Sequence, residues 1–220
     1  MKYWPCFLGL LVVGTVCAQP LPSLPGLGDG ARRELIDVRA APWRILGRVQ
    51  TELGVKCTGF AVAPNVVMTA AHCLWLPKMH TYIRPSDVHV LMGYSRGSYR
   101  QHAHVVRFII PPGYDPKNES ATGASDRATL LLSEPVIATR DLLQAIPVQD
   151  GARAMLVGYS QDRNEVPFCD MDCHINGVTV SGLVHHDCVA TKGVRCSPLP
   201  IRNSYAPWGI GGHAVPAALR

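Results

Sequence analysis

One histidine stands in a context that could support proton transfer. The stretch from Cys57 to Cys73 reads Cys-Thr-Gly-Phe-Ala-Val-Ala-Pro-Asn-Val-Val-Met-Thr-Ala-Ala-His-Cys, in which two short apolar strands flank a Pro-Asn turn. This pattern predicts a hairpin that a single bridge could close. His72 follows the second strand, where the backbone would be rigid. An imidazole held this way suits general-base catalysis, because histidine titrates near neutrality and proton transfer needs fixed geometry. The alternative is a histidine without a catalytic role that simply follows a disulfide-bonded strand.

The complete string decides between these two interpretations. Cys-x-Gly-Phe followed by Thr-Ala-Ala-His-Cys resembles the histidine motif of the trypsin-like (chymotrypsin-fold) serine endopeptidases, and the resemblance runs from about Pro42 to the C-terminus. It implies a mainly β fold of two antiparallel six-stranded β-barrels, an active site in the cleft between them, and hydrolysis of peptide bonds. By the same resemblance His72 would be the general base of a catalytic triad.

Asp126 is identified as the orienting acid of that triad. Residues 125–135 read Ser-Asp-Arg-Ala-Thr-Leu-Leu-Leu-Ser-Glu-Pro, which resembles the Asp-x-Ala-Leu-x-x-Leu segment of the family. Asp126 would accept a hydrogen bond from the ring of His72, fix its tautomer and stabilise the imidazolium. An aspartate before an apolar strand is otherwise a turn or cap residue, but its place after His72 and before a buried-looking strand favours the triad role.

The third member of the triad is missing. The family places its nucleophile in Gly-x-Ser-Gly-x-Pro, and the one matching frame here, residues 193–198, reads Gly-Val-Arg-Cys-Ser-Pro. The backbone N–H groups of Gly193 and Arg195 would form the oxyanion hole. Arg195 occupies the nucleophile position, and a guanidinium is always protonated and cannot form an acyl-enzyme. We therefore expect ordinary triad hydrolysis to be lost, unless Cys196 or Ser197 attacks after a shift of the loop.

The segment around this motif also departs from vertebrate trypsins. No Ile-Val-Gly-Gly stands upstream, and Val194 replaces the aspartate that would pair with a new N-terminus. The upstream Asp-Cys pair resembles instead the bacterial glutamyl-endopeptidase-like branch, so substrate preference stays open. Residues 200–212 form a Pro-broken run that we expect to be too short and polar for a central barrel strand.

A nucleotide-level cause is one hypothesis for this departure. Val-Arg-Cys-Ser-Pro can be encoded by GTC CGG TGC TCC CCC, and the same bases read one position later give Ser-Gly-Ala-Pro, which is the nucleophile motif. A frameshift just before Arg195, with the frame restored near residues 213–215, would account for the loss. Three interpretations therefore compete: an impaired serine endopeptidase, a pseudoprotease that binds a partner, and a defective gene product.

The N-terminal residues predict an exported protein. Lys2 precedes an apolar stretch, Phe7 to Val16, and Val-Cys-Ala offers a cleavage site, so residues 1–18 are identified as a signal peptide. Export would make the mature protein secreted or periplasmic. The expected organisation continues with a leader or pro-segment without a packed core of its own, a first barrel, a linker and a second barrel: 19–41, 42–134, 135–150 and 151–220. Only about 70 residues follow the linker, so the second barrel could be incomplete.

Composition limits the partners. The 220 residues are 47% hydrophobic and 17% charged, which excludes a disordered or collagen-like chain. The formal net charge is +5, falling to +4 once Lys2 is removed, and the basic residues form no run, so nucleic acid is not expected. No apolar stretch approaches the about 20 residues that span a bilayer. We expect a monomer that acts on a polypeptide substrate or binds a protein ligand, without contact with the membrane after signal removal.

Short β-rich runs bounded by Gly, Pro, Asn or Asp fill the rest of the chain, and no long run has helical periodicity. They are predicted as strands at residues 43–51, 59–63, 66–70, 88–94, 104–110, 128–132, 154–159 and 177–184.

Six cysteines remain after signal removal, which allows fifteen pairings in an oxidising compartment. Cys173 and Cys188 each flank a strand at a spacing suited to a bridge, which leaves Cys169 and Cys196 over. Two histidine groups, His102 with His104 and the run 185–187, are interpreted as surface residues, so neither a metal nor a cofactor is expected. Arg96, Arg100 and Arg107 are a candidate basic face.

Overall fold

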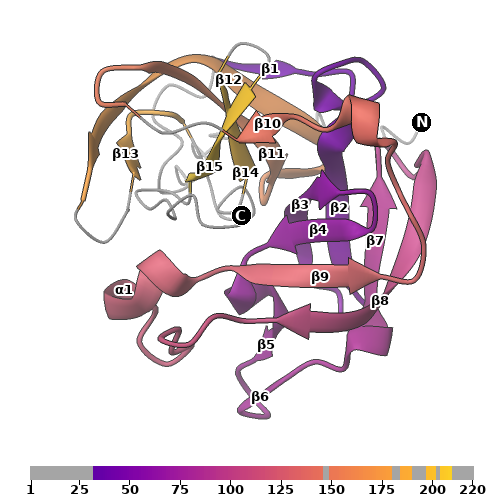
Figure 1. Cartoon of the computed structure of the whole chain (residues 1–220). Coiled ribbons are helices and arrows are strands. Elements are labelled where there is room, and N and C mark those ends of the chain that lie inside the picture. Colours follow the sequence, from indigo (N-terminus) through magenta and orange to yellow (C-terminus); the bar gives the residue numbers. More distant parts are fainter. Residues whose placement is uncertain (1–31, 146–148, 180–183, 190–196, 202–203, 210–220) are drawn as a thin grey trace, which may run out of the picture.

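The structure is a computed structural model that describes residues 32–145, 149–179, 184–189, 197–201 and 204–209. The described residues are mainly strands, arranged in two groups that lie one above the other in Figure 1. The mainly β fold predicted from the sequence is confirmed.

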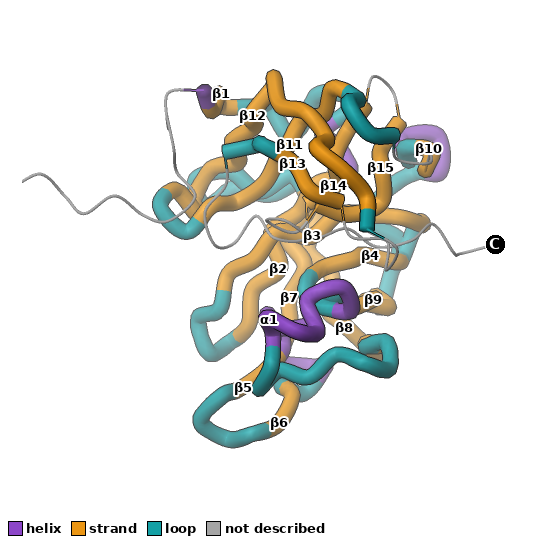
Figure 2. The backbone as a smooth tube through the Cα atoms, turned by 90° about the vertical axis from the view of Figure 1, so that its left-hand side faces the viewer, coloured by secondary structure: helices purple, strands orange, loops and turns teal. Residues whose placement is uncertain are grey.

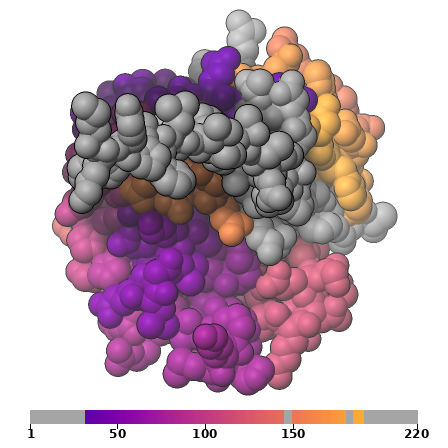
Figure 3. All heavy atoms as spheres, turned by 180° about the vertical axis from the view of Figure 1, so that it is seen from behind, coloured from indigo at the N-terminus to yellow at the C-terminus, as the bar shows by residue number. Residues whose placement is uncertain are grey.

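The first group closes into a barrel of six antiparallel strands. In order around the barrel they are β2 (Leu46–Thr51), β3 (Lys56–Ala63), β4 (Val66–Thr69), β9 (Ala128–Leu132), β8 (Gln101–Ile109) and β7 (Val88–Met92). Alternate side chains point inward, and Val49, Phe60, Val67, Val90 and Leu130 are at most 1% exposed. Figure 3 shows the segments of this barrel, coloured indigo to pink, packed into one lobe in the lower part of the view.

Short elements connect these strands. The 3-10 helices are η2 (Trp43–Ile45), η3 (Ala71–Leu74), η4 (Pro85–Asp87), η5 (Gly123–Ser125) and η6 (Thr139–Asp141). A two-stranded hairpin, β5 (Trp75–Leu76) with β6 (Thr81–Tyr82), directly follows η3, and a single helical turn, α1 (Glu119–Thr122), precedes η5. Figure 2 shows the hairpin and α1 in the lower half of the view.

The second group forms two sheets in the described part of the chain. One contains β1 (Arg33–Leu35), β12 (Arg163–Val178) and β11 (Arg153–Ser160) in that order, with β13 (Val184–His186) paired to β12. The other contains β10 (Gln144–Ala145), β15 (Ser204–Gly209) and β14 (Ser197–Ile201). Among these residues the strand pairing does not close into a second six-stranded barrel.

Three sequence expectations differ from this architecture. Part of the segment expected to lack a packed core is packed, because β1 pairs with β12 and Val38 is 2% exposed. The strand expected at 177–184 is instead the end of β12 and the start of β13, with 180–183 outside the described residues. The Pro-broken run after Leu199 contributes to two paired strands, β14 and β15.

Polar contacts join the two groups. The Tyr159 backbone N–H on β11 donates to the Thr58 hydroxyl at 2.9 Å, and the Tyr159 hydroxyl donates to the Tyr94 carbonyl at 2.7 Å. Glu165 on β12 accepts hydrogen bonds from Arg48 at 3.0 Å and Lys56 at 2.9 Å, and a further one from the Tyr94 hydroxyl. These contacts attach the second group of strands to the outside of the first barrel.

Candidate active site

The ends of two paired strands bring His72 and Asp126 together. β4 ends at Thr69 and β9 begins at Ala128, and these two residues are paired in the antiparallel ladder. His72 follows Thr69 in η3, and Asp126 precedes Ala128 at the end of η5. The strand register alone therefore places both side chains at one end of the first barrel.

The two side chains form a closely held pair. The Nδ1 atom of His72 lies 2.7 Å from Oδ2 of Asp126, and the backbone N–H of His72 donates to Oδ1 at 2.9 Å. The Asp126 side chain is 3% exposed and that of His72 is 22% exposed. Both carboxylate oxygens are used, so the imidazole ring has a fixed orientation, with Nδ1 bound to Asp126 and Nε2 3.5 Å from Sγ of Cys73. A ring held this way can accept a proton at Nε2 while the carboxylate stabilises the resulting charge.

A disulfide and a hydrogen bond make the backbone around His72 rigid. Cys57 on β3 is bonded to Cys73, with 6.4 Å between their Cα atoms, and both residues are buried. The Thr69 hydroxyl donates to the Thr58 carbonyl at 2.8 Å, one strand over. The bridge predicted from the Cys57–Cys73 spacing is confirmed, and it fixes the turn that carries the imidazole.

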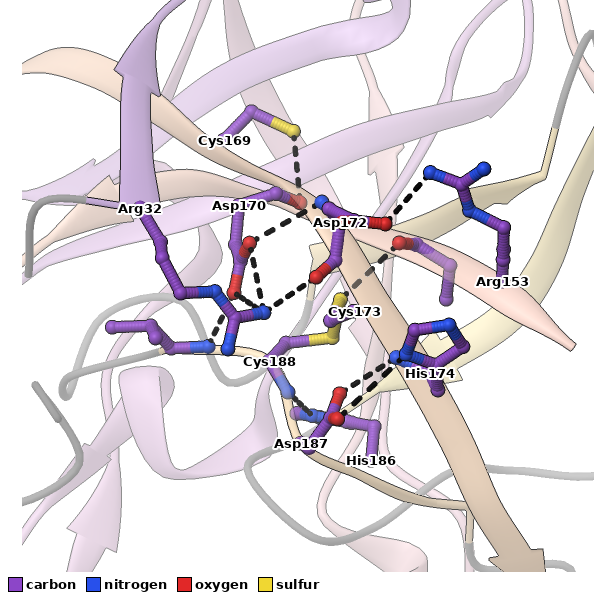
Figure 4. Close-up of polar contacts among 12 residues, drawn as sticks. Arg32, Arg153, Cys169, Asp170, Asp172, Cys173, His174, His186, Asp187 and Cys188 are labelled. Atoms are coloured by element: carbon purple, nitrogen blue, oxygen red, sulfur yellow. Dashed lines mark hydrogen bonds and ion pairs between the residues drawn. A yellow bond between two sulfur atoms is a disulfide. The ribbon is translucent and has the colours of Figure 1, made fainter. Parts of the chain in front are cut away.

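The second group of strands carries the other predicted bridge. Cys173 on β12 is bonded to Cys188, which follows β13, and Figure 4 shows the bond among the surrounding polar residues. Cys169 is a buried free thiol, and burial raises its pKa well above the ordinary value, so it remains protonated and unreactive at neutral pH. Gly193, Arg195 and Cys196 lie outside the described residues, and so does the predicted oxyanion hole.

Asp170 is a buried acid that sequence reasoning missed. Its side chain is 1% exposed, its Oδ2 accepts the backbone N–H of Val189 at 2.8 Å, and Arg32 reaches the same oxygen at 3.1 Å, as drawn in Figure 4. The contact to Val189 ties the chain that leads towards the nucleophile motif to the middle of β12. An Asp in a mixed polar stretch gives no sequence signal for this role, because its partners are distant in the chain.

Tyr82 is a second neighbour of the pair that the sequence did not reveal. Its ring packs edge-on against Trp75, with centroids 5.0 Å apart, and against Phe108 at 6.2 Å. Burial raises the pKa of Tyr82, with smaller contributions from the negative charges of Asp126 and Asp115. The Tyr82 hydroxyl is therefore neutral at physiological pH.

Comparison with known proteins agrees with this geometry. The Trypsin family model matches residues 34–196, which is more than half of the chain. The structure agrees with this family: it has a closed six-stranded barrel, and a disulfide-bonded turn of that barrel carries the histidine of a histidine–aspartate pair. The chain belongs to the trypsin family of serine peptidases, whose membership implies a polypeptide as the substrate class.

Solved structures show the same fold at low identity. A Glu endopeptidase in complex with MPD is 19% identical, with a TM-score of 0.68 over 80% of this chain and 83% of that chain. A mutant of human heparin binding protein (CAP37) is 18% identical, with a TM-score of 0.58 over 83% and 87% of the two chains.

Among the described residues, no helix has the length and apolar character needed to cross a membrane.

Proposed function

We propose that this chain is a secreted member of the trypsin family that keeps the histidine–aspartate pair of the peptidases and has lost the serine nucleophile. The observation that carries the proposal is a contrast between two parts of one triad. His72 and Asp126 are held at 2.7 Å with both carboxylate oxygens engaged, whereas Arg195 stands at the nucleophile position of the only matching motif. A general base without a nucleophile to activate does not form an acyl-enzyme.

The extent of the family similarity supports this proposal. The match to the family model ends at residue 196, immediately after Arg195. The two bridges, the buried carboxylate of Asp126 and the closed first barrel all lie before that point. The match to the family model therefore ends inside the segment, residues 193–198, that should carry the nucleophile.

A serine-directed fluorophosphonate probe tests the loss of the nucleophile. The natural chain should remain unlabelled, and labelling of any of its residues would overturn the role given to Arg195. The informative partner is Arg195→Ser combined with Cys196→Gly, which rebuilds Gly-x-Ser-Gly-x-Pro. We expect this variant to be labelled and to cleave peptides about 10⁶-fold faster than the natural chain. Adding His72→Ala to the rebuilt variant should abolish the gain and serves as the control.

The nucleotide sequence across codons 190 to 215 tests the origin of the loss. A gene that carries the out-of-frame Ser-Gly-Ala-Pro codons before residue 198 would support a frameshifted peptidase. Codons incompatible with that alternative frame would instead support a chain that has been retained with Arg195. In the second case a cooperative melting transition of the secreted protein is expected, because a retained protein must fold.

A basic surface supports binding of an anionic partner as a second function. One surface pocket is lined by Arg39, Arg44 and Arg100 with a single acid, Asp141. A second pocket is lined by Arg39 and Arg96 with one acid, Asp37. Arg44 is fixed by the Arg39 carbonyl at 2.7 Å and by Asp141 at 3.3 Å. Burial lowers the pKa of Arg100, whose guanidinium still remains charged near neutrality. The similarity to a heparin binding protein suggests a sulfated glycan as the partner.

Salt-dependent retention on immobilised heparin tests this second function. Arg44→Ser together with Arg100→Ser should elute at a clearly lower salt concentration than the natural chain. Arg84→Ser together with Arg107→Ser is the matched control, because it also removes two arginines, both exposed and neither part of the two pockets. If the pocket variant and the control elute at the same salt concentration, net charge alone explains the retention and the pockets are not a specific binding surface.

A further inference from the structure

Three histidines converge on the outer face of the first barrel. His89 lies on β7, and His102 and His104 lie on the neighbouring β8, where His104 is directly paired with His89 and His102 with Leu91. Side chains two residues apart on a strand point to the same face. Ala103 and Val105 point into the barrel and are buried, so the alternate histidines of β8 point outward beside His89.

The three rings are close enough to share one ion. One ligand nitrogen from each ring can be chosen so that all three lie within 4.8 Å of one another. The ring centroids are 5.2 Å apart for His89 and His102, 5.0 Å for His89 and His104, and 4.7 Å for His102 and His104. Zn–N bonds of about 2.0–2.1 Å in a tetrahedral site imply nitrogens about 3.3 Å apart. Small side-chain rotations would bring the three nitrogens to that spacing.

One contact within the cluster joins two ring nitrogens, which requires one of them to be a hydrogen-bond acceptor. Nδ1 of His89 lies 3.0 Å from Nε2 of His102, a hydrogen-bond distance that requires one of these two nitrogens to be unprotonated. An unprotonated imidazole nitrogen is the form that binds a metal ion.

A carboxylate stands behind one of the three rings. Oε1 of Glu52 lies 3.7 Å from Nε2 of His89, on the side of the ring opposite to the nitrogen that faces His102. The Glu52 backbone N–H donates to the Asp87 carbonyl at 3.1 Å, which fixes the position of this residue beside β7. A carboxylate behind a ligating histidine orients the ring and increases its basicity. The Glu52 side chain is 62% exposed and lies within an ion-pair distance of His89, so a small rotation would bring it to hydrogen-bond distance.

We propose that His89, His102 and His104 bind one divalent transition-metal ion of the Zn²⁺ and Cu²⁺ class, with Glu52 as a positioning residue. Imidazole nitrogens suit this class of ion, whereas Ca²⁺ and Mg²⁺ require oxygen ligands. Three protein ligands leave at least one coordination position for water or an external ligand. The site joins β7 to β8 and uses no part of the histidine–aspartate pair, so it does not depend on the proposed loss of the nucleophile.

Calorimetric titration of the full mature chain, purified without a histidine tag and stripped with a chelator, tests the site with Zn²⁺ alone. We expect one ion per chain and a thermal midpoint that rises by several degrees on binding. His102→Asn combined with His104→Asn should weaken binding at least 100-fold, and Glu52→Gln should weaken it about 10- to 100-fold. His80→Asn is the matched control, because it removes an exposed imidazole from a turn and should leave the affinity unchanged.

Copper supplies a readout that needs no variant. The electron paramagnetic resonance spectrum of the Cu²⁺-loaded natural chain should show coupling to three imidazole nitrogens. The proposal fails if that spectrum shows fewer than three nitrogens. It also fails if Zn²⁺ binds no more tightly than 1 mM, or if the double asparagine variant binds Zn²⁺ as the natural chain does.

Discussion

The first barrel closes from one continuous stretch of chain, whereas the second group of strands depends on segments from both ends. β2 to β9 span residues 46–132 and close without help from outside that range. The second group needs β1, which pairs with the distant β12, and β10, which pairs in parallel with β15. A change near the C-terminus can therefore damage the second group while the first barrel keeps its closed ladder. In the sequence, Arg195 belongs to the second group, which is the region that depends on distant segments of the chain.

The largest expected loss of stability comes from a substitution at the centre of the first barrel. Phe60 is fully buried on β3, and Phe60→Ala leaves a cavity that should lower the free energy of unfolding by about 3–5 kcal/mol. Urea denaturation followed by far-UV circular dichroism measures the change. A loss below about 1 kcal/mol would mean that the closed barrel is not the stabilising centre of the molecule.

The two disulfides allow a direct comparison of the regions. Their sequence separations are 16 for Cys57–Cys73 and 15 for Cys173–Cys188, so the chain-entropy model assigns each about 3 kcal/mol. Replacing either pair with serines should therefore cost the same, as measured by chemical denaturation. A clearly smaller loss for the second pair would show that the native second region is itself loosely held, which would sharpen the contrast with the closed barrel.

A smaller effect tests how tightly β3 packs between its neighbours. A Cβ atom on Gly59 would lie 2.6 Å from Cγ2 of Val49 and 2.9 Å from Cγ1 of Val67, so Gly59→Ala should cost about 1–3 kcal/mol. Gly54→Asn is the control, because that turn has open space and a left-handed conformation that asparagine tolerates. Equal thermal midpoints for the two variants would contradict tight packing at β3.

The smallest effect tests the junction between the two regions. Hydrogen bonds from the Tyr94 hydroxyl and then Lys56 lower the pKa of Glu165 from its ordinary value of 4.5 to about 2. A lowered carboxyl pKa stabilises the fold above pH 4.5, and this contribution is lost as the pH falls from 4.5 to 2. The Glu165 side chain is half exposed, so solvent screening keeps the contribution below about 1 kcal/mol.

Thermal melts of the natural chain and Glu165→Gln between pH 2 and pH 6 measure this contribution. The difference between the two proteins should shrink as the solution becomes more acidic. A constant difference over that range would assign the effect to packing and not to the charge of Glu165.

Sequence reasoning predicted local features better than distant ones. The strands of the first barrel and both disulfides were predicted because alternating apolar residues and cysteine spacing are local signals. β12 was missed because Pro167 and three acids interrupt its apolar pattern, yet it is the longest strand described, with alternate residues such as Cys173 and Ile175 buried. β1 and the position of His89 beside His104 depend on pairing between separate strands, which no single window of the sequence reveals.

The pairing of β1 with β12 has a mechanical consequence. The buried guanidinium of Arg33 contacts Asp162 at 2.6 Å and the Ser160 hydroxyl at 3.1 Å, beside the strand pairing of residues 33–35. Tension applied along β1 from the N-terminal side would be shared at once by the strand hydrogen bonds and this ion pair. The chain can therefore be pulled or tethered from its N-terminal end, and the first barrel would bear little of the force until β1 separates from β12.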